Sequence, residues 1–450
     1  MEKLKLSEIA KACKGTYNND CEINGVCIDT RKITEGCLFI CIKGERFDAH
    51  QFAREALEKG AAAVMIHRSI DTDGNYVMVE DTSKALLALG GYYRSKFDLR
   101  LVGLTGSVGK TTTKEFLYLV LSEKYNTIKT QGNLNNEIGL PQMLFQIEAG
   151  TQAAVIEMGM NHFGEIHKLS LAAKPTMALI TNIGTSHIEN LGSREGIFKA
   201  KLEILDGLEK DSTVILNGDN DLLCGVKNEA YNIVFFGVDN GDFRAENIIQ
   251  TENETSFEIS YYGKKQKIVI PTIGIHNVYN ALAAFAVGYF LDIAPDLCAA
   301  GLNQYVPEGM RQKCVSRNGV TFIEDCYNAS PDSMKAAIST LSDIKGNKKI
   351  AVLSDMLELG SYAETAHKEI GRTVARSDID YLLTVGEMSH LTAAGAEESG
   401  MKNVFHFNSK EDLTEKLLEI LENGDAVVFK ASRGMKLEDV IHSVYDRWGK

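Results

Sequence analysis

The stretch from Leu101 to Thr113, Leu-Val-Gly-Leu-Thr-Gly-Ser-Val-Gly-Lys-Thr-Thr-Thr, constrains the fold of this chain more than any other. A short apolar run predicts a buried strand, two glycines and a lysine follow it, and residues 113–121 have the apolar spacing of a helix. Because glycine lacks a Cβ, Gly106 and Gly109 let backbone N–H groups turn toward one point, at the positive end of the helix dipole. The sequence therefore predicts a strand, a phosphate-binding loop and a helix.

The side chains of this loop favour a nucleotide as its ligand. Lys110 supplies a full positive charge, and the hydroxyl of Thr111 is a typical Mg²⁺ ligand. The common pattern has a glycine where this chain has Leu104, so only its second half, Thr-Gly-x-x-Gly-Lys-Thr, fits. An ordinary glycine-rich turn before a helix is the alternative. We assign the nucleotide contacts to the whole loop, namely Thr105, Gly106, Ser107, Val108, Gly109, Lys110, Thr111 and Thr112.

Length and composition indicate a multidomain globular protein. The 450 residues suffice for about three domains, and 44% of them are apolar. A net charge of −13 argues against a general nucleic-acid binder, and the nine cysteines, without a close Cys-x-x-Cys pair, favour a reduced compartment. We find neither a signal-peptide core nor an apolar run long enough to span a membrane. We therefore expect a cytoplasmic protein.

The apolar patterns divide the chain into three α/β units, at residues 1–98, 99–312 and 313–450. The second unit starts with the phosphate loop and should form a parallel sheet. The third has five strands, most of them separated by helices, and should form another. In the second unit we expect strands at residues 153–157, 177–183, 214–217, 233–236, 257–262 and 266–270, and a helix at 281–290.

Two polar residues follow predicted strands of the second unit, Glu157 and His187. Ligands gather at the carboxyl ends of the strands in open parallel sheets, which makes both residues candidate metal ligands beside bound phosphates. The alternative for His187 is an ordinary hydrogen-bonding role. Further along, Lys199 and Lys201 are two residues apart on a predicted helix, so they lie on different faces and one can point inward.

Amide-rich segments form a second group of candidates. The loop at residues 130–139 could hydrogen-bond a polar ligand or could be a polar turn that caps a helix. Asn277 stands near a predicted helix start and could be only its N-cap. In the first unit, Asp29-Thr-Arg31 and then residues 43–48 with His50 could form an anion site, because the arginine fork suits phosphate or carboxylate. A surface salt bridge is the alternative for the Asp-Thr-Arg turn.

In their order along nearly the whole chain, these motifs resemble one family, the ATP-dependent Mur ligases. The motifs are Asp29-Thr-Arg31, Gly36-Cys-Leu-Phe39, Thr105-Gly-Ser-Val-Gly-Lys-Thr111, Asn135-Asn-Glu-Ile-Gly139, Glu157-Met-Gly159, Thr181-Asn-Ile-Gly184 with His187, Ala200-Lys201, His276-Asn277 with Asn280, Gly309-Met-Arg311, Asp325-Cys-Tyr-Asn-Ala-Ser-Pro-Asp-Ser333, Asp355-Met-Leu-Glu-Leu-Gly360 and Lys430-Ala-Ser-Arg433. The Asp-Asn-Pro-Arg signature of the branch that adds the third amino acid is missing. The Tyr327-Asn-Ala-Ser-Pro331 element instead resembles the branch that adds D-alanyl-D-alanine.

The resemblance implies a fold and an activity. It implies a small α/β N-terminal domain that binds a UDP substrate (1–98), a central P-loop ATPase-like domain (99–312) and a Rossmann-like C-terminal domain that binds D-alanyl-D-alanine (313–450). The implied reaction joins that dipeptide to UDP-N-acetylmuramoyl-tripeptide through an acyl phosphate, with release of ADP and phosphate, as the final cytoplasmic step of peptidoglycan precursor synthesis. We expect a monomer. Whether the third peptide residue is L-lysine or diaminopimelate stays open.

The resemblance also implies roles for single residues. Lys110, His187, Lys201 and Arg311 would be catalytic, with Arg311 at the γ-phosphate. Thr111 and Glu157 would bind one Mg²⁺, and His187 with a carbamylated Lys201 a second. Asn277 and Asn280 would contact adenine and Asp325 the ribose. The substrate residues would be Asp29, Thr30 and Arg31 for UDP, Asn135, Asn136 and Glu137 for the muramoyl peptide, and Asn328, Lys430, Ser432 and Arg433 in the third domain. No residue is implied as the base for the amine.

Two other functions use a phosphate loop of this kind. A GTP switch would need a guanine-selecting Asn-Lys-x-Asp element, and the sequence has none. A folylpolyglutamate-type ligase shares the central chemistry but is not expected to carry the Asp-Thr-Arg first domain. A non-catalytic scaffold need not keep Glu157, His187 and Arg311 together.

Overall fold

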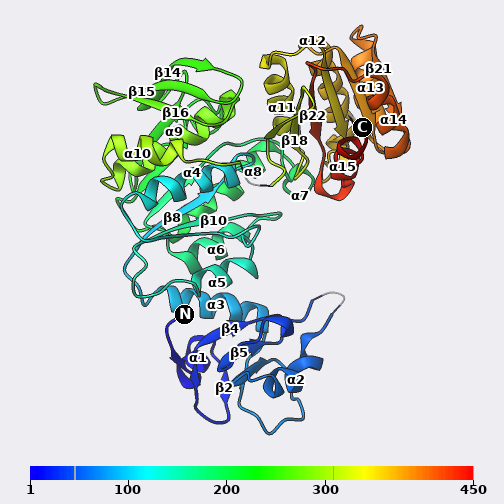
Figure 1. Cartoon of the computed structure of the whole chain (residues 1–450). Helices are drawn as coiled ribbons and strands as arrows, with labels where there is room; N and C mark the ends of the chain where they lie inside the picture. Colours follow the sequence, from blue (N-terminus) through cyan, green and yellow to red (C-terminus); the bar gives the residue numbers. More distant parts are fainter. Residues whose placement is uncertain (45–46, 308, 449–450) are drawn as a thin grey trace.

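A computed structural model shows three α/β domains and describes residues 1–44, 47–307 and 309–448 (Figure 1). The N-terminal domain has a five-stranded sheet in which β4 to β7 are parallel and β2 is antiparallel. Its order is β2 (Thr16–Tyr17), β7 (Tyr76–Met78), β6 (Ala63–Ile66), β5 (Cys37–Ile40) and β4 (Gly25–Cys27). A two-stranded sheet and three helices complete it: β1 (Leu4–Lys5) with β3 (Glu22–Ile23), α1 (Leu6–Ala12), α2 (Ala53–Glu58) and α3 (Thr82–Arg94).

The central domain is built on a nine-stranded sheet. In spatial order its strands are β16 (Lys264–Ile270), β15 (Thr255–Tyr261), β14 (Phe243–Gln250), β13 (Asn232–Gly237), β12 (Thr213–Asn217), β11 (Met177–Ile180), β8 (Arg100–Thr105), β10 (Ala153–Glu157) and β9 (Thr127–Lys129). The strands from β14 to β9 are parallel, and antiparallel pairing joins β14, β15 and β16 at one edge. Its helices are α4 (Lys110–Ser122), α5 (Gly139–Leu144), α6 (Glu165–Ala173), α7 (Ile188–Leu191), α8 (Arg194–Leu202), α9 (Ile275–Phe290) and α10 (Pro295–Asn303).

Helices cover both faces of this sheet, because successive strand residues point to opposite sides. Leu101 of β8 is fully buried in a core shared with α3, α5, α6 and α8, whereas the next residue, Val102, is buried in a core with α4, α9 and α10. The phosphate loop thus leaves the middle of a two-sided sheet. Its position at the carboxyl end of β8 is where ligands bind in such sheets.

The C-terminal domain has a six-stranded sheet that is parallel except for β17. Its order is β17 (Lys313–Arg317), β18 (Val320–Asp325), β22 (Ala426–Lys430), β19 (Lys349–Ser354), β20 (Tyr381–Val385) and β21 (Val404–Phe407). Its helices are α11 (Pro331–Asp343), α12 (Ala363–Arg376), α13 (Ser389–Glu398), α14 (Lys410–Ile420) and α15 (Glu438–Arg447). Two cores again fill the two faces, one toward α14 and α15 and one toward α11, α12 and α13. The predicted α/β class with parallel sheets is confirmed.

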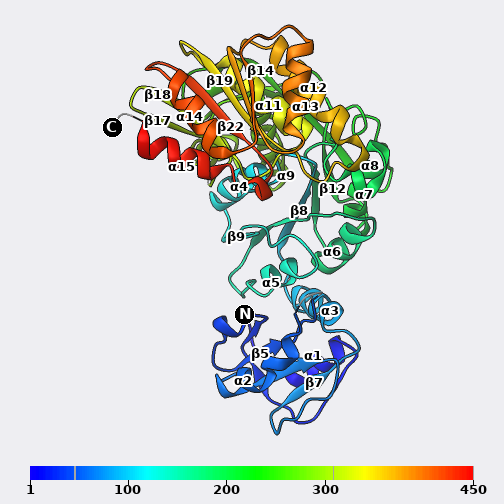
Figure 2. The ribbon, with the colours of Figure 1, turned by 90° about the vertical axis from the view of Figure 1, so that its right-hand side faces the viewer.

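Helix α3 joins the first two domains, and both views place it between them (Figures 1 and 2). Leu86, Leu89 and Tyr93 of this helix are fully buried in a core that continues from the N-terminal sheet into the central domain. The Tyr93 hydroxyl donates a hydrogen bond to the Ile147 carbonyl at 2.6 Å, and the buried Arg94 side chain donates to the Ala173 carbonyl at 3.0 Å. The N-terminal domain is therefore packed against its neighbour and not attached by a free linker.

Helix α9 and strand β14 differ from the sequence expectations. Helix α9 begins at Ile275, six residues before the predicted start, and its N-cap is Gly274, so Asn277 lies inside the helix and not at its cap. Strand β14 was not predicted, because a bulge between Glu246 and Ile249 breaks the alternation of its apolar and polar residues. None of the helices within the described ranges is long and apolar enough to cross a membrane.

Candidate active site

A cavity of about 420 Å³ lies between the central and C-terminal domains. The central domain lines it with the phosphate loop, with Glu157, His187 and Lys201, and with the start of α9. Arg311, at the border between the two domains, and the segment after β18 in the C-terminal domain also line it. Of the sequence candidates, the cavity brings together Ser107, Val108, Gly109, Lys110, Thr111, Thr112, Asn135, Asn136, Glu157, His187, Lys201, Asn277, Asn280, Arg311, Asp325, Asn328 and Lys430.

The phosphate loop has little freedom to move. A Cβ at Gly106 would lie 1.8 Å from the Thr181 hydroxyl, so only glycine fits there. The backbone N–H of Val108 donates to the Asn182 side-chain oxygen at 3.0 Å, and the Thr181 hydroxyl donates to the Val108 carbonyl at 2.7 Å. The segment after β11 therefore holds the loop in place. Thr105 lies below the loop at the end of β8, where its hydroxyl donates to the Met158 carbonyl at 2.9 Å.

Two lysines lie at this end of the cavity, Lys110 half-buried and Lys201 buried. The Lys110 ammonium donates to the Gly106 carbonyl at 2.7 Å, and burial lowers the pKa of Lys110. The Lys201 side chain is 2% exposed, while Lys199 is exposed, so the prediction that one of them points inward is confirmed. Burial, with the nearby charge of Lys110, lowers the pKa of Lys201 well below its ordinary value. The Lys110 ammonium favours an anion in the cavity, whereas burial favours the neutral form of Lys201.

Glu157 faces the loop from the end of β10. Its carboxylate accepts a hydrogen bond from the Asn135 amide at 2.8 Å and one from the Thr111 hydroxyl at 3.4 Å. The Glu157 side chain is buried and is held in place from two sides. A carboxylate and a hydroxyl oxygen this close are the ligands that Mg²⁺ prefers.

His187 reaches the same region from the start of α7, with a left-handed backbone (φ 65°). Its Nδ1 atom is buried and lies 3.0 Å from a Glu358 carboxylate oxygen of the C-terminal domain, but the angles do not make a hydrogen bond. Burial first, and then Lys110 and Lys201, lower the pKa of His187 to about 4. The ring is therefore neutral near pH 7, so the contact with Glu358 is not an ion pair.

The first turns of α9 supply a chain of buried amides. The Asn277 amide donates to the Ile273 carbonyl at 2.7 Å, and the Asn280 amide donates to the Asn277 side-chain oxygen at 3.2 Å. Gln312, at the border of the third domain, accepts from Asn277 at 3.2 Å and also contacts the His276 ring. Its φ of 50° is left-handed. This chain ties the nucleotide side of the cavity to the start of the C-terminal domain.

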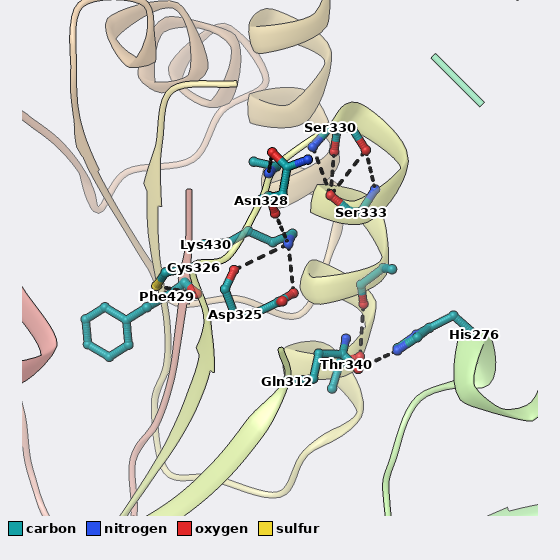
Figure 3. Close-up of polar contacts among 12 residues, drawn as sticks. His276, Gln312, Asp325, Cys326, Asn328, Ser330, Ser333, Thr340, Phe429 and Lys430 are labelled. Atoms are coloured by element: carbon teal, nitrogen blue, oxygen red, sulfur yellow. Dashed lines mark hydrogen bonds and ion pairs between the residues drawn. The ribbon is translucent and has the colours of Figure 1, made fainter. Parts of the chain in front are cut away.

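On the opposite wall, the third domain presents a buried ion pair (Figure 3). The Lys430 ammonium lies 2.8 Å from an Asp325 carboxylate oxygen, and both residues end neighbouring parallel strands. Arg311 stacks on the Tyr327 ring, 3.8 Å from its centroid. The border itself is closed by Asp332 at the start of α11, whose carboxylate accepts from the Thr185 backbone N–H at 3.0 Å.

Several sequence candidates do not line the cavity. The Arg31 guanidinium is exposed and forms a fork with the Asp29 carboxylate at 2.7 Å, in the N-terminal domain with Thr30. Glu137 pairs with Lys168 at 2.8 Å on the surface. The Asn136 side chain lines the cavity but accepts from the Gly139 N–H at 2.8 Å, which is the helix-capping alternative.

Two further sequence candidates, near the end of the third domain, make contacts only within that domain. Ser432 accepts a hydrogen bond from the Leu357 N–H at 3.0 Å, and Arg433 pairs with Glu438 at 2.8 Å. Neither side chain lines the cavity. Both therefore hold loops of the third domain together in this structure.

The proposed anion group at residues 43–50 has a structural role at His50. This ring is buried, with Nδ1 at 2.6 Å from the Asp48 carboxylate and Nε2 accepting from the His67 N–H at 3.1 Å. Both ring nitrogens are thus used within the domain. Glu45 and Arg46 lie outside the described residues.

Family models match the three domains in order. Residues 22–87 match the model "Mur ligase family, catalytic domain", residues 104–288 the Mur ligase middle domain, and residues 310–433 the "Mur ligase, glutamate ligase domain". The chain belongs to the Mur ligase family.

Named relatives of this Mur ligase match it over its whole length. The chain is 42% identical to a UDP-N-acetylmuramoyl-tripeptide--D-alanyl-D-alanine ligase of Bacillus subtilis, over 99% of both chains. A crystal structure of MurF from Acinetobacter baumannii aligns with a TM-score of 0.94 at 32% identity, over 99% of this chain and 100% of the other. A MurF ligase of Thermotoga maritima in complex with ADP aligns with a TM-score of 0.85 at 29% identity, over 94% and 97%.

Sequence reasoning missed the residues that join the two sides of the cavity. Gln312, Asp332 and Glu358 contact the central domain. Each stands within or next to a quoted motif, but the motif gives these three residues no chemical role. Their roles depend on how two domains meet, and hydrophobic periodicity carries no signal for that. Glu358 lies within the quoted Asp355–Gly360 segment, but only its left-handed φ of 62° and its nearness to His187 distinguish it.

Proposed function

We propose that this Mur ligase joins D-alanyl-D-alanine to UDP-N-acetylmuramoyl-tripeptide, with ATP converted to ADP and phosphate. The observation that carries the proposal is the single cavity in which a phosphate loop, a candidate metal set and the third domain meet. The names of the full-length relatives and the ADP complex of one structural relative support it. The product is the pentapeptide precursor of peptidoglycan, and the enzyme acts as a monomer in the cytoplasm.

The chemistry requires activation of a carboxylate, which is a poor electrophile. An oxygen of the tripeptide carboxylate attacks the γ-phosphorus of ATP, ADP leaves, and an acyl phosphate forms. The amine of D-alanyl-D-alanine then attacks the acyl carbon, and inorganic phosphate leaves with the former carboxylate oxygen. The first step brings two anions together. Lys110 and Arg311, on opposite sides of the cavity, are placed to offset that charge.

The residues present fit Mg²⁺ at two places. Thr111 and Glu157 would hold one ion beside the phosphates, because both offer oxygen atoms within hydrogen-bond distance of one another. His187 would bind a second ion through its neutral ring, together with Lys201. Bound Mg²⁺ supplies charge neutralisation and orientation of the phosphates.

Lys201 can join a metal set only after it becomes an anion. Burial beside Lys110 favours the neutral amine, which is the form that attacks CO₂. A new N–C bond then gives a carbamate and releases one proton. The resulting anion offsets the Lys110 charge and offers oxygen ligands.

The third domain excludes water and brings the second substrate. Water would hydrolyse an acyl phosphate, so contacts that close the border, such as Asp332 with Thr185, protect the intermediate. Asn277 and Asn280 would contact adenine and Asp325 the ribose. Asn328 faces the cavity from the domain assigned to D-alanyl-D-alanine. Ser432 and Arg433 would contribute to dipeptide binding only indirectly, because they support the loops of the third domain.

The N-terminal domain, residues 1–98, is assigned to the UDP part of the substrate. Asp29, Thr30 and Arg31 lie there, although in this structure Asp29 occupies the fork of Arg31. UDP binding would have to replace that contact with a phosphate, which fits the same fork. Asn135, Asn136 and Glu137 follow the phosphate loop in sequence and would contact the peptide.

The test is a product assay with the purified full chain, ATP, Mg²⁺ and UDP-N-acetylmuramoyl-tripeptide, with and without D-alanyl-D-alanine. We expect phosphate release and a gain in mass of the UDP-linked product that both require the dipeptide. Both forms of the tripeptide, with L-lysine and with diaminopimelate, are assayed. ATP hydrolysis that is indifferent to the dipeptide would refute the proposed acceptor.

A further inference from the structure

Lys430 is buried at the end of β22, directly opposite Asp325 at the end of β18. Figure 3 shows its ammonium pointing into the turn that follows β18. Three oxygens surround it: the Asp325 carboxylate at 2.8 Å, the Asn328 carbonyl at 2.9 Å and the Asp325 carbonyl at 3.4 Å. An ammonium has three N–H donors, so these three oxygens use all of them. A substrate carboxylate would have to displace one.

The three contacts fix the first part of the loop that lines the cavity. Asn328 also accepts a hydrogen bond at its side-chain oxygen from the Ala329 N–H at 2.9 Å. Ser330 then caps α11 by accepting from the Ser333 N–H. The segment between β18 and α11 is thus held at both ends, by Lys430 at the start and by the cap at the end.

We infer that Lys430 is a positioning residue for nucleotide binding, whose ammonium fixes the Asp325 carboxylate and the Asn328 carbonyl so that Asp325 faces the cavity in one orientation. This inference rests on the proposed function, which assigns the ribose to Asp325. It differs from the sequence expectation that Lys430 binds the substrate itself.

The charge state of Asp325 supports this role. The carboxyl group is largely buried, and its burial raises the pKa of Asp325, while Lys430, His276 and Arg311 oppose that rise. His276 faces it from α9 and Arg311 from the domain border, and burial lowers the pKa of His276, so that ring is a weak counter-charge. Lys430 is the cation in direct contact. Without it, a buried carboxyl group takes up a proton and loses one of its acceptor sites.

The experiment measures the affinity of the full chain for ADP by calorimetry across about pH 6 to pH 9. Lys430→Met removes the charge at similar length, and Lys335→Met is the matched control at an exposed position of α11. We expect Lys430→Met to bind ADP about tenfold more weakly at neutral pH and to regain affinity as the pH rises, because Asp325 ionises again. The control and the wild-type chain should lack this recovery.

A double variant tests whether Lys430 acts through Asp325. Asp325→Asn should weaken ADP binding, and Asp325→Asn/Lys430→Met should be no weaker than Asp325→Asn alone. Because removal of both charges avoids an unpaired buried ion, this comparison remains decisive if Lys430→Met does not fold. Equal affinity of Lys430→Met and wild type at every pH, or additive losses in the double variant, would overturn the inference.

The outcomes for Lys430 and for the proposed function separate cleanly. Wild-type chain that fails to bind ADP refutes the nucleotide site and the inference with it. Wild-type chain that binds ADP but makes no dipeptide-dependent product refutes the ligase proposal, while the Lys430 comparison is still read from ADP affinity.

Discussion

The N-terminal domain meets the central domain through a continuous apolar core, whereas the C-terminal domain meets it across a polar cavity. At the first border, α3 buries Tyr93 completely and its hydrogen bonds end on central-domain carbonyls. At the second, the contacts are side chains such as Asp332, Gln312 and Glu358 on the third-domain side.

This difference separates two physical tasks. Apolar burial gives stability without a ligand, and it fixes the distance between the N-terminal sheet and the phosphate loop. Polar groups at a cavity give little stability alone but set the charge that a ligand meets. Changes at the polar border should therefore alter catalysis with little effect on stability, and changes at the apolar border should do the opposite.

Lys110→Met, at the polar border, should have the largest effect. Loss of the charge that faces the transferred phosphoryl group is expected to lower kcat by about 10³-fold. The melting temperature should not fall, because the change also removes a buried charge near Lys201. Phosphate release measures the rate, and Lys199→Met is the matched control on an exposed face. Activity within tenfold of wild type would contradict the role of Lys110.

Tyr93→Ala should break the apolar border. Removal of this fully buried ring is expected to lower the free energy of unfolding by about 3–4 kcal/mol. Tyr93→Phe keeps the ring and loses only the hydroxyl contacts to Ile147 and Glu2, so it should cost about 1 kcal/mol. Urea unfolding measures both, and kcat of the folded fraction should stay near wild type. A loss in kcat that, converted to free energy, exceeds the loss in free energy of unfolding would show that the apolar border also serves catalysis.

His187 predicts a pH dependence at the polar border. Its folded pKa is about 4, against an ordinary value of 6.5, so the unfolded chain binds the proton first as the pH falls. The cost of keeping this ring neutral is absent above about pH 6.5, grows as the pH falls, and reaches roughly 2–3 kcal/mol near pH 4.

His187→Asn should therefore weaken the acid sensitivity of the melting temperature between those pH values. Asparagine is suitable because it tolerates the left-handed backbone at this position. Melting curves of both chains without nucleotide give the comparison. Identical slopes would mean that His187 is not held neutral by the fold.

Asp332→Ala should have the smallest effect of the four. It removes the acceptor of the Thr185 N–H at the closed border, a contact worth about 1 kcal/mol. We expect a severalfold loss in kcat/KM for ATP and a melting temperature within about 2 °C of wild type. Asp332→Asn keeps one acceptor oxygen, so its kcat/KM should lie between the values of wild type and Asp332→Ala. A lowered melting temperature with normal kcat/KM would assign Asp332 to stability instead.

Much of the fold could be predicted because its signals are local. The loop at Gly106–Thr111 and the strand that leads to Glu157 each combine an apolar run with an adjacent polar motif. Helical spacing predicts that one of Lys199 and Lys201 points inward, and the structure shows that it is Lys201. Strand β14 could not be predicted in this way, since its partners on the sheet, and not its own pattern, keep it extended.

The sequence predicted the site residues that a single domain supplies, but not the contacts between residues that are far apart in the chain or in different domains. Lys430 and Asp325 are 105 positions apart in the sequence. Only the structure shows that the Lys430 ammonium contacts two oxygens of Asp325 and one of Asn328. Likewise, the nearness of Glu358 to His187 depends on the angle between two domains. Chemistry that one strand end or one helix face can supply is readable from sequence, and chemistry shared across a border is not.

The most direct test of the acyl-phosphate ligase is to follow the substrate oxygen. UDP-N-acetylmuramoyl-tripeptide labelled with ¹⁸O in its reacting carboxylate is incubated with the enzyme, ATP, Mg²⁺ and D-alanyl-D-alanine, and the released phosphate is analysed by mass. The proposed mechanism predicts that each phosphate carries one ¹⁸O atom and that each appears with one molecule of extended peptide. Phosphate that contains no label would contradict transfer of the γ-phosphoryl group to the carboxylate.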